Sequence, residues 1–361
     1  MSNNKFDTPP IFITLYPDHL LMRRCLIISL LLLPAIVAVA RQWRPDCLGD
    51  GYQMTVIEQP DDYSGKVVTT VVRKLSPCGD STAVLYVHGF NDYFFQKEMG
   101  DRFVDSCYNF YAVDLRKYGR SLLPGQKPYQ ARDIKEYYAD LDSALLVMRQ
   151  DGQRRVILMG HSTGGLITSS FLNHDPDTAM VKALILNSPF LEWNMGAFTR
   201  KVGVPLVSFM GRLFPNMSIS QGDDTSYGKS LSKDYYGRWE FDTNLKTIHP
   251  RKVTAGWIRA ITRAQSDLHS HSDIKTPILL MHSDHSVTDG KTPDDFQSGD
   301  AVLNVRDIIK WGNKLGPDVT DVTVKDGLHD LILSRPDVSD NAYKAIFQFI
   351  NNQGLDERAK K

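Results

Sequence analysis

The sequence has few cysteines and no excess of charge of either sign. Four of its 361 residues are cysteine, with no C-x-x-C pair and no zinc-finger spacing, so a disulfide-stabilised scaffold and a zinc module are excluded. Lys and Arg number 42, as do Asp and Glu, and without a basic run the chain has no electrostatic surface for nucleic acid. Gly and Pro, at 25 and 18 residues, are too few for a low-complexity chain. What is present is a globular composition, 42% hydrophobic, long enough for two domains or for one large α/β domain with an insertion.

Residues 1–45 have the pattern of a leader. Residues 26–40 carry no charge, follow Arg23 and Arg24, and end in the A-x-A spacing that signal peptidase recognises. A spanning helix needs about 20 apolar residues, so an anchor would have to recruit flanking residues. We expect a signal peptide or a membrane anchor, with membrane association through residues 23–40 and with either Met1 or Met22 as the true start. The rest of the chain is then exported or anchored in the cell envelope; the alternative is a cytoplasmic protein in which this segment is a buried helix.

From residue 46 onward the pattern is that of an α/β domain. Residues 52–59 and 66–74 alternate apolar and polar side chains, which predicts an antiparallel pair of strands. Continuous apolar runs typical of strands buried on both faces follow at 83–87, 109–114, 156–159, 183–186 and 278–281, with a weaker run at 322–325. Helical patterns separate these runs, which predicts right-handed crossovers and a mostly parallel, eight-stranded sheet flanked by helices.

The segment between the runs at 183–186 and 278–281 is far longer than an ordinary crossover. We predict that residues 191–275 form a helical cap inserted after the sixth strand, and that residues 46–190 and 276–361 form the core. The apolar residues of the first cap helix are expected either to line an acyl pocket or to fix the cap to the core: Phe198, Val202, Val204, Leu206, Val207, Phe209, Met210, Leu213 and Phe214.

The motif G-H-S-T-G-G at residues 160–165 carries the chemistry. A buried strand leads into it and a helical pattern at 166–172 leads out, which is the setting of a nucleophile elbow that presents Ser162 at the edge of the sheet. Glycines are needed at such a turn because a Cβ would clash with the neighbouring strand or helix. The side chain of His161 is expected to point away from Ser162.

A serine hydroxyl is a weak nucleophile and needs a base, and in this arrangement an acid and then a histidine follow the serine along the chain. His329 follows the last predicted strand, where the base belongs. The residue pattern leaves two candidates for the acid, because Asp284 directly follows a strand and Asp300 directly precedes a helical pattern. The backbone N–H groups of Thr163 and Phe90, which follow the nucleophile and the His-Gly pair at 88–89, are the expected oxyanion donors.

Four other histidines could in principle bind a metal. His269, His271, His282 and His285 lie near the end of the cap and the strand that follows it, but they lack a tetrahedral ligand spacing. We therefore expect a polar loop there, and neither a metal nor a cofactor.

Together, six segments resemble the α/β-hydrolase superfamily, and within it the monoacylglycerol lipase, lysophospholipase and serine aminopeptidase group. The resemblance covers about residues 52–350 and rests on HGFNDY (88–93), DLRKYGRS (114–121), GHSTGG (160–165), LFPNMSIS (213–220), DAVLNV (300–305) and GLHD (327–330). It implies the α/β-hydrolase fold. It also implies Asp300 as the acid, because in that group the acid opens a D-x-V-V-[DN] segment at this spacing before the histidine. The sequence departs from the group in the polar loop 282–299 and in having His282 where a glycine is usual.

The resemblance implies a serine hydrolase that cleaves carboxyl esters by a Ser-His-Asp acyl-enzyme mechanism, with a small-molecule or lipid ester, most often a monoacylglycerol or lysophospholipid, as its partner. One alternative is an aminopeptidase-like exopeptidase, which would need acidic groups for the substrate amine; the candidates in the cap are Glu192, Asp223, Asp224 and Glu240. The other alternative is a non-catalytic binding protein on the same fold, although a complete triad argues against it.

In this fold the strands that follow Cys78 and Cys107 are parallel neighbours, so both cysteines lie at one end of the sheet. In an oxidising compartment they could pair, and two free thiols are the alternative. Cys47 would remain unpaired.

Overall fold

The computed structural model describes residues 42–79, 81–175, 178–222, 224–287 and 292–356. Most of the expected leader, residues 1–45, therefore lies outside the described residues. Within the described part, no helix is both long enough and apolar enough to cross a bilayer.

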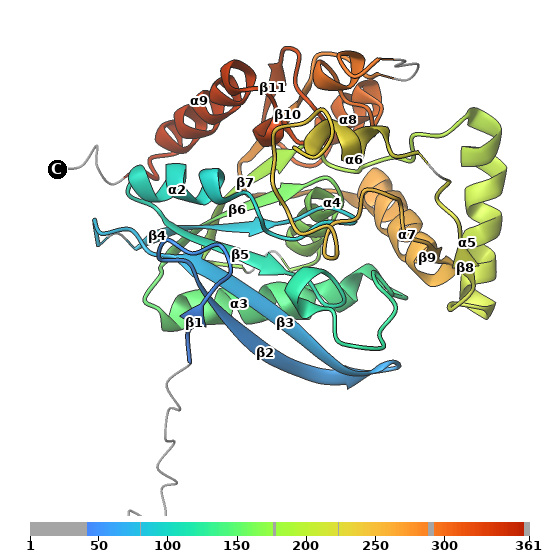
Figure 1. Ribbon diagram of the computed structural model, residues 1–361, viewed down its shortest axis with the longest axis horizontal. Helices are drawn as coiled ribbons and strands as arrows, with labels where there is room; N and C mark the ends of the chain where they lie inside the picture. The colour runs from blue at the N-terminus through green and yellow to red at the C-terminus, as the bar shows by residue number, and fades with distance from the viewer. Residues whose placement is uncertain (1–41, 80, 176–177, 223, 288–291, 357–361) are drawn as a thin grey trace, which may run out of the picture. The chain divides into compact units, whose positions relative to one another are not determined.

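A mostly parallel sheet forms the centre of the fold, as predicted (Figure 1). In the described part of the chain its strand order is β1-β2-β3-β5-β4-β6-β7-β10-β11. The strands from β5 to β11 in this order are parallel, whereas β1, β2 and β3 pair antiparallel. The bounds are Arg44–Pro45, Gln53–Asp62, Gly65–Lys74, Thr82–Val87 (β4), Asn109–Asp114 (β5), Arg155–His161 (β6), Val181–Asn187 (β7), Ile278–Ser283 (β10) and Val319–Val324 (β11). The eight predicted strands are all present, and the two-residue β1 adds a ninth.

Helices cover both faces of the sheet, which explains the continuous apolar runs. Every residue of β4 and of β5 is buried. Side chains alternate between the two faces, so Leu85 joins the core on one face and Tyr86 the core on the other. The first core packs under α3 (Tyr138–Gln150), α4 (Thr163–His174) and α8 (Val305–Gly312), and the second under α2 (Lys97–Asp105) and α9 (Pro336–Asn352).

The segment predicted to form a cap lies between β7 and β10, after the sixth long strand. It contains a π-helical turn at Thr199–Gly203, α5 (Val204–Leu213), α6 (Ser226–Leu231), α7 (Ala255–His271) and the small pair β8 (Ser218–Ile219) and β9 (Val253–Thr254). Figure 1 shows α7 between α4 and the outer helix α5. Pro205 does not break the first cap helix, because it lies in the first turn of α5, where no N–H is needed.

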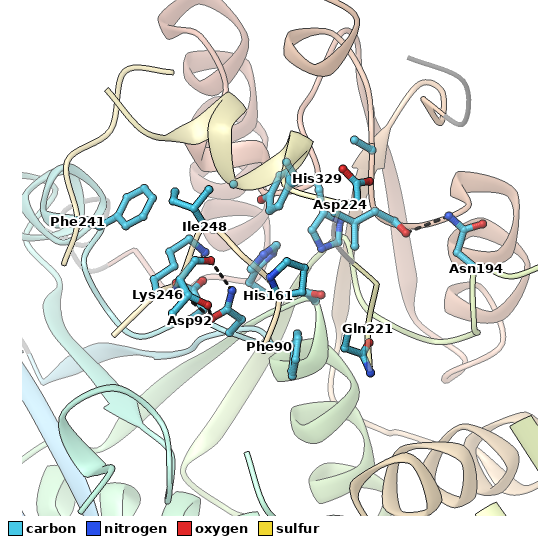
Figure 2. A pocket seen from close by; sticks show the side chains of 18 residues that line it. Phe90, Asp92, His161, Asn194, Gln221, Asp224, Phe241, Lys246, Ile248 and His329 are labelled. Atoms are coloured by element: carbon cyan, nitrogen blue, oxygen red, sulfur yellow. Dashed lines mark hydrogen bonds and ion pairs between the residues drawn. The ribbon is translucent and has the colours of Figure 1, made fainter. Parts of the chain in front are cut away.

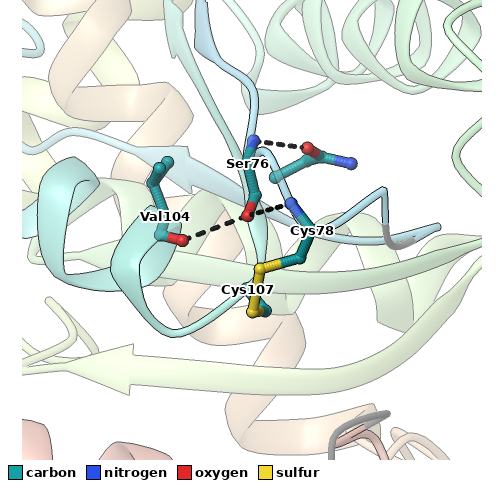
Figure 3. The surroundings of a disulfide bond; sticks show 5 residues. Ser76, Cys78, Val104 and Cys107 are labelled. Carbon is teal, nitrogen blue, oxygen red and sulfur yellow. Dashed lines mark hydrogen bonds between the residues drawn. A yellow bond between two sulfur atoms is a disulfide. The ribbon is translucent and has the colours of Figure 1, made fainter.

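Cys78 and Cys107 form a disulfide, with Cα atoms 5.4 Å apart (Figure 3). The bond joins the segment before β4 to the turn between α2 and β5. Ser76 supports the same region, because its hydroxyl donates to Val104 O at 3.1 Å and accepts from Cys78 N at 3.3 Å. The pairing left open by the sequence is thus present, and Cys47 is free and exposed.

Candidate active site

Ser162 lies on a strained turn between β6 and α4. Its φ of 53° and ψ of −116° fall outside the regions that L-residues usually occupy. The flanking glycines make the turn sterically feasible. A Cβ on Gly160 would lie 2.6 Å from Gly164 O, and one on Gly164 would overlap Val87 O. The turn therefore places a serine at the carboxyl edge of the sheet and at the amino end of α4.

The backbone of Ser162 is fixed by the neighbouring strand and loop. Its N–H donates to Asn187 O at 3.0 Å, and its C=O accepts from Phe190 N at 2.9 Å and from Leu166 N at 3.2 Å. The residue itself is buried. These hydrogen bonds fix the backbone from which the hydroxyl projects, and a fixed backbone favours a nucleophile held in a reactive position.

His329 meets Asp300 directly. Its Nδ1 lies 3.0 Å from Asp300 Oδ2, and both residues are buried. The other oxygen, Asp300 Oδ1, accepts from the N–H groups of Val302 and Leu303 at 2.8 Å each. Three contacts therefore hold the carboxylate at the histidine.

Asp284, the other candidate acid, has different partners. Its Oδ1 lies 3.0 Å from His285 Nδ1 and accepts from Asp326 N at 2.8 Å. Although partial burial works in the opposite direction, these hydrogen bonds lower the pKa of Asp284 below its usual value. The structure therefore brings Asp300, and not Asp284, to His329.

The His-Gly loop after β4 lies directly against the nucleophile turn. A Cβ on Gly89 would be 3.1 Å from Ser162 Cβ, so only a glycine allows this approach without displacement. His88 fixes the loop, because its Nε2 accepts from Leu115 N at 3.1 Å and its Nδ1 faces Gly89 O at 2.8 Å. Phe90 consequently lines the same cavity as Ser162, while Thr163 begins α4 directly after Ser162.

The side chain of His161 was expected to point away from Ser162, but it lines the same cavity as Ser162. The ring of His161 lies 4.9 Å from that of His329, between ring centroids (Figure 2). The sharp turn at Ser162 ends the alternation of the strand, so neighbouring side chains can share one side. Burial lowers the pKa of His161, and the charge of Asp330 opposes this effect only in part.

One group of side chains has the elements of a metal site. Within the described residues, the ligand atoms of Asp92, His161 and Asp330 lie within 4.8 Å of one another. These carboxylates are already engaged by protein donors. Lys246 Nζ lies 3.1 Å from Asp92 Oδ1, and Asp330 accepts from Asn187 Nδ2 at 2.7 Å. A divalent ion would have to displace the Lys246 ammonium, so the donor set fits a metal poorly.

The four histidines weighed as metal ligands are not brought together as such a group in the described part of the chain. His282 Nε2 lies 2.8 Å from Asp321 Oδ1, and His285 Nδ1 lies 3.0 Å from Asp284 Oδ1. His271 lies 3.6 Å from Asp267, while His269 meets Leu191 O at 2.8 Å.

A cavity of about 470 Å³ connects these elements (Figure 2). Besides Ser162, His161 and His329, it is lined by Phe90, Asn91, Asp92, Asn194, Gln221, Asp224, Tyr227, Gly228, Phe241, Lys246, Thr247, Ile248, Pro250, Ala301 and Val302. The apolar residues of the first cap helix are not among them, so the first of the two alternatives, an acyl pocket lined by this helix, is not supported. The second alternative holds for Val204 and Val207, which pack in or against the core. The helix directs most of its other apolar residues toward solvent.

Among the acidic cap residues suggested for an amine, Asp224 alone lines this cavity in the described part of the chain. Glu192 accepts from Trp193 N, and Glu240 pairs with Lys233. Asp223 lies outside the described residues.

Two groups of site residues were missed by sequence reasoning. Asp92 and Lys246 pair within the cavity wall, although Lys246 lies in a stretch of the cap without regular structure. Asn187 and Asp330 join the nucleophile turn to the histidine loop. A signal existed for the second pair, because Asp330 directly follows His329 and Asn187 is a polar residue at the carboxyl end of a buried strand.

The mostly parallel sheet flanked by helices and the strained turn at Ser162 define the class of protein: it is an α/β-hydrolase. A family model described as serine aminopeptidase, S33, matches residues 80–294. The chain belongs to this family of serine hydrolases. No curated protein matches the sequence.

Solved structures share the fold at low sequence identity. A monoacylglycerol lipase from Paleococcus ferrophilus is 20% identical, with a TM-score of 0.59 over 78% of this chain and 98% of that chain. A soluble variant of monoglyceride lipase from Saccharomyces cerevisiae is 15% identical, with a TM-score of 0.60 over 82% and 96%. A carboxylesterase from Nitrososphaera gargenis is 14% identical, with a TM-score of 0.53 over 83% and 100%.

Proposed function

We propose that this hydrolase cleaves carboxyl esters of mono-acyl lipids, such as a monoacylglycerol or a lysophospholipid, through an acyl-enzyme on Ser162. The observation that carries the catalytic part is the 3.0 Å contact between His329 Nδ1 and Asp300 Oδ2, at a cavity that Ser162 also lines. The three residues then act as nucleophile, base and orienting acid.

In the proposed mechanism, His329 Nε2 takes the proton of the Ser162 hydroxyl while the oxygen attacks the ester carbonyl. The N–H groups of Phe90 and Thr163 stabilise the oxyanion. Asp300 holds the proton on Nδ1 and stabilises the imidazolium. His329 then protonates the leaving alcohol, activates the water that attacks the acyl-enzyme, and returns the proton to Ser162.

The lipid part of the proposal rests on the cavity wall and on the fold. Phe90, Phe241, Ile248 and Val302 supply apolar surface for an acyl chain, and the side-chain amide of Gln221 supplies a polar partner for a head group. Two of the structures that share the fold are monoacylglycerol or monoglyceride lipases.

A second candidate is an exopeptidase that releases amino-terminal residues. Asp224 lines the cavity and could pair with a free substrate amine, and the family is described as serine aminopeptidase. Replacing Asp224 by Asn would then reduce turnover of aminoacyl anilides while leaving ester cleavage unchanged.

We also propose that the catalytic part works outside the cytoplasm. The charge-free segment 26–40 behind two arginines supports this placement, as does a disulfide between Cys78 and Cys107. Mapping thiols in protein taken from its native compartment without reductant tests the proposal, which predicts that Cys47 is alkylated and Cys78 is not.

The deciding experiment is turnover by the full chain beside Ser162→Ala. The panel holds p-nitrophenyl esters of increasing chain length, a monoacylglycerol, a lysophospholipid and aminoacyl anilides. Ester cleavage that depends on Ser162 and rises with chain length would support the lipid esterase. Anilide cleavage would favour the exopeptidase, and failure of a fluorophosphonate probe to label Ser162 would indicate a non-catalytic protein.

A further inference from the structure

The first cap helix exposes an apolar stripe. Phe198, Val202, Leu206, Phe209 and Leu213 follow one another at every third or fourth position, so they share one face of the helical segment 198–213. Their exposed fractions are 78, 49, 60, 56 and 56%. We call these five residues the α5 stripe. Soluble proteins rarely expose a contiguous apolar surface of this kind unless it contacts a partner.

The opposite face of α5 already has its partner inside the protein. Val204, Ser208 and Gly211 are buried there, and a Cβ on Gly211 would overlap Ala255 O at the start of α7. Figure 1 shows α5 on the outer side of α7. The α5 stripe therefore lies on the side of the helix opposite the buried face. In the described structure it is a second apolar face, exposed to solvent.

Positive charge accompanies the α5 stripe. Arg212 lies on α5, and Arg259 and Arg263 lie on the neighbouring α7. Arg259 lies at the contact between the two helices, because its Nη1 is 3.5 Å from Ser208 O of α5, and Arg263 follows it one turn later on α7. Burial, together with the charges of Arg263 and Arg212, lowers the pKa of Arg259. Asp133, 3.8 Å from Arg263, is the one acidic partner found for these arginines among the described residues. An apolar helix face beside basic side chains matches the boundary between acyl chains and anionic head groups.

The α5 stripe is also linked to the cavity. Asn194 and Gln221 both line the cavity, and the chain between them forms α5 (Figure 2). A surface that binds the α5 stripe would therefore hold the segment that frames the substrate site.

We propose that the α5 stripe docks this protein onto an anionic lipid surface, with Phe198, Leu206 and Leu213 inserted among the acyl chains and Arg212 and Arg263 at the head groups. Docking needs no turnover, so this proposal stands or falls separately from the ester chemistry. The lipid surface is favoured over a second copy of the chain because the flanking charge is of one sign, and two identical basic faces would repel each other.

The test places a fluorescent reporter in the α5 stripe of the full chain. Leu206→Trp adds a tryptophan at a stripe position, and Leu146→Trp adds one at a similarly exposed site on α3, where Leu146 is 50% exposed. Both proteins are mixed with vesicles of phosphatidylcholine and phosphatidylglycerol, with and without bromine on the acyl chains. We expect at least threefold stronger bromine quenching of the added emission for Leu206→Trp than for Leu146→Trp. Equal quenching of Leu206→Trp and Leu146→Trp would overturn the proposal. Both proteins contain residues 1–41, so any vesicle binding by that segment affects them equally.

A second pair of variants tests the two parts of the surface. Phe198→Ser with Leu206→Ser should reduce hydrolysis of a vesicle-borne ester about tenfold, while cleavage of a soluble short-chain ester changes less than twofold. The double variant Arg212→Gln/Arg263→Gln should bind anionic vesicles more weakly and bind pure phosphatidylcholine vesicles as the native protein does. The control, Lys344→Gln on α9, should bind both kinds of vesicle as the native protein does.

A stripe variant that loses both activities would first be checked for folding by circular dichroism, and Leu206→Met would then replace it as the conservative comparison. A native dimer that becomes monomeric in Phe198→Ser/Leu206→Ser, without quenching by brominated lipid, would assign the α5 stripe to a second copy and overturn the lipid proposal.

Discussion

The side-chain amide of Asn187 donates a hydrogen bond of 2.7 Å to Asp330 Oδ1, and this contact joins the nucleophile turn to the loop that carries His329. The same Asn187 accepts from Ser162 N through its backbone oxygen and from Leu331 N through its side chain. One residue at the end of β7 thus contacts both segments between which the proposed mechanism transfers a proton.

We predict that Asn187→Ala lowers kcat by roughly 10- to 100-fold with little change in KM, because a small displacement of reacting groups costs about this much. Steady-state kinetics with a soluble ester measures it. Asn351→Ala, at an exposed position of α9, is the matched control and should remain near native activity. An unchanged kcat for Asn187→Ala would show that the loops keep their distance without this residue.

The choice of acid gives a second prediction. Asp300→Asn should lower kcat by about 10³- to 10⁴-fold, since the amide cannot hold His329 in the productive tautomer or stabilise its charge. Asp284→Asn should retain most of the activity, because Asp284 contacts His285 and Asp326 instead. Parallel kinetics of the two variants decide the matter, and the opposite ranking would assign the acid to Asp284.

Residue patterns were sufficient for most of the fold because each buried strand needs a continuous apolar run. The runs at 109–114 and 278–281 correspond directly to β5 and β10. Helix α2 was not predicted, since it is short and contains Gly100, whose missing side chain makes room for Tyr52. The pairing of Cys78 with Cys107 also needed the structure, because sequence spacing does not report a distance between Cα atoms.

The site was only partly accessible from sequence. Local motifs point to Ser162, since strand, turn and helix follow each other along the chain, and the place of His329 after the last strand makes it the candidate base. The choice between Asp284 and Asp300 as the candidate acid required either a family resemblance or coordinates. The reason is that one of them directly follows a strand and the other directly precedes a helical pattern, with a polar loop between them. The orientation of α5 was not predictable, since an apolar stripe at helical spacing has the same sequence whether it faces the core or solvent.

Steric crowding at the elbow gives a third prediction. Gly164→Ala should destabilise the protein by about 2–4 kcal/mol, because the added Cβ would overlap backbone oxygens of Val87 and His88 that cannot move away easily. Urea unfolding followed by circular dichroism measures the change. Gly196→Ala is the control, since a Cβ there meets no atom within 4 Å. Equal midpoints for the two variants would mean that the elbow relaxes without cost.

The buried His161 gives a fourth prediction, on pH. Its folded-state pKa is lowered, mainly by burial, below the value of about 6.5 expected in an unfolded chain. The unfolded state therefore binds the proton more readily. The free energy of unfolding begins to fall as pH drops below about 6.5, and it keeps falling until pH reaches the folded-state pKa.

Removing this group should make stability less sensitive to acid. We expect the midpoint temperature of the native protein to fall more between pH 7.5 and 5.5 than that of His161→Asn, with each protein compared with itself. His271→Asn, which removes an exposed histidine on α7, should follow the native curve. Parallel pH curves for the native protein and His161→Asn would show that the acid sensitivity comes from other groups.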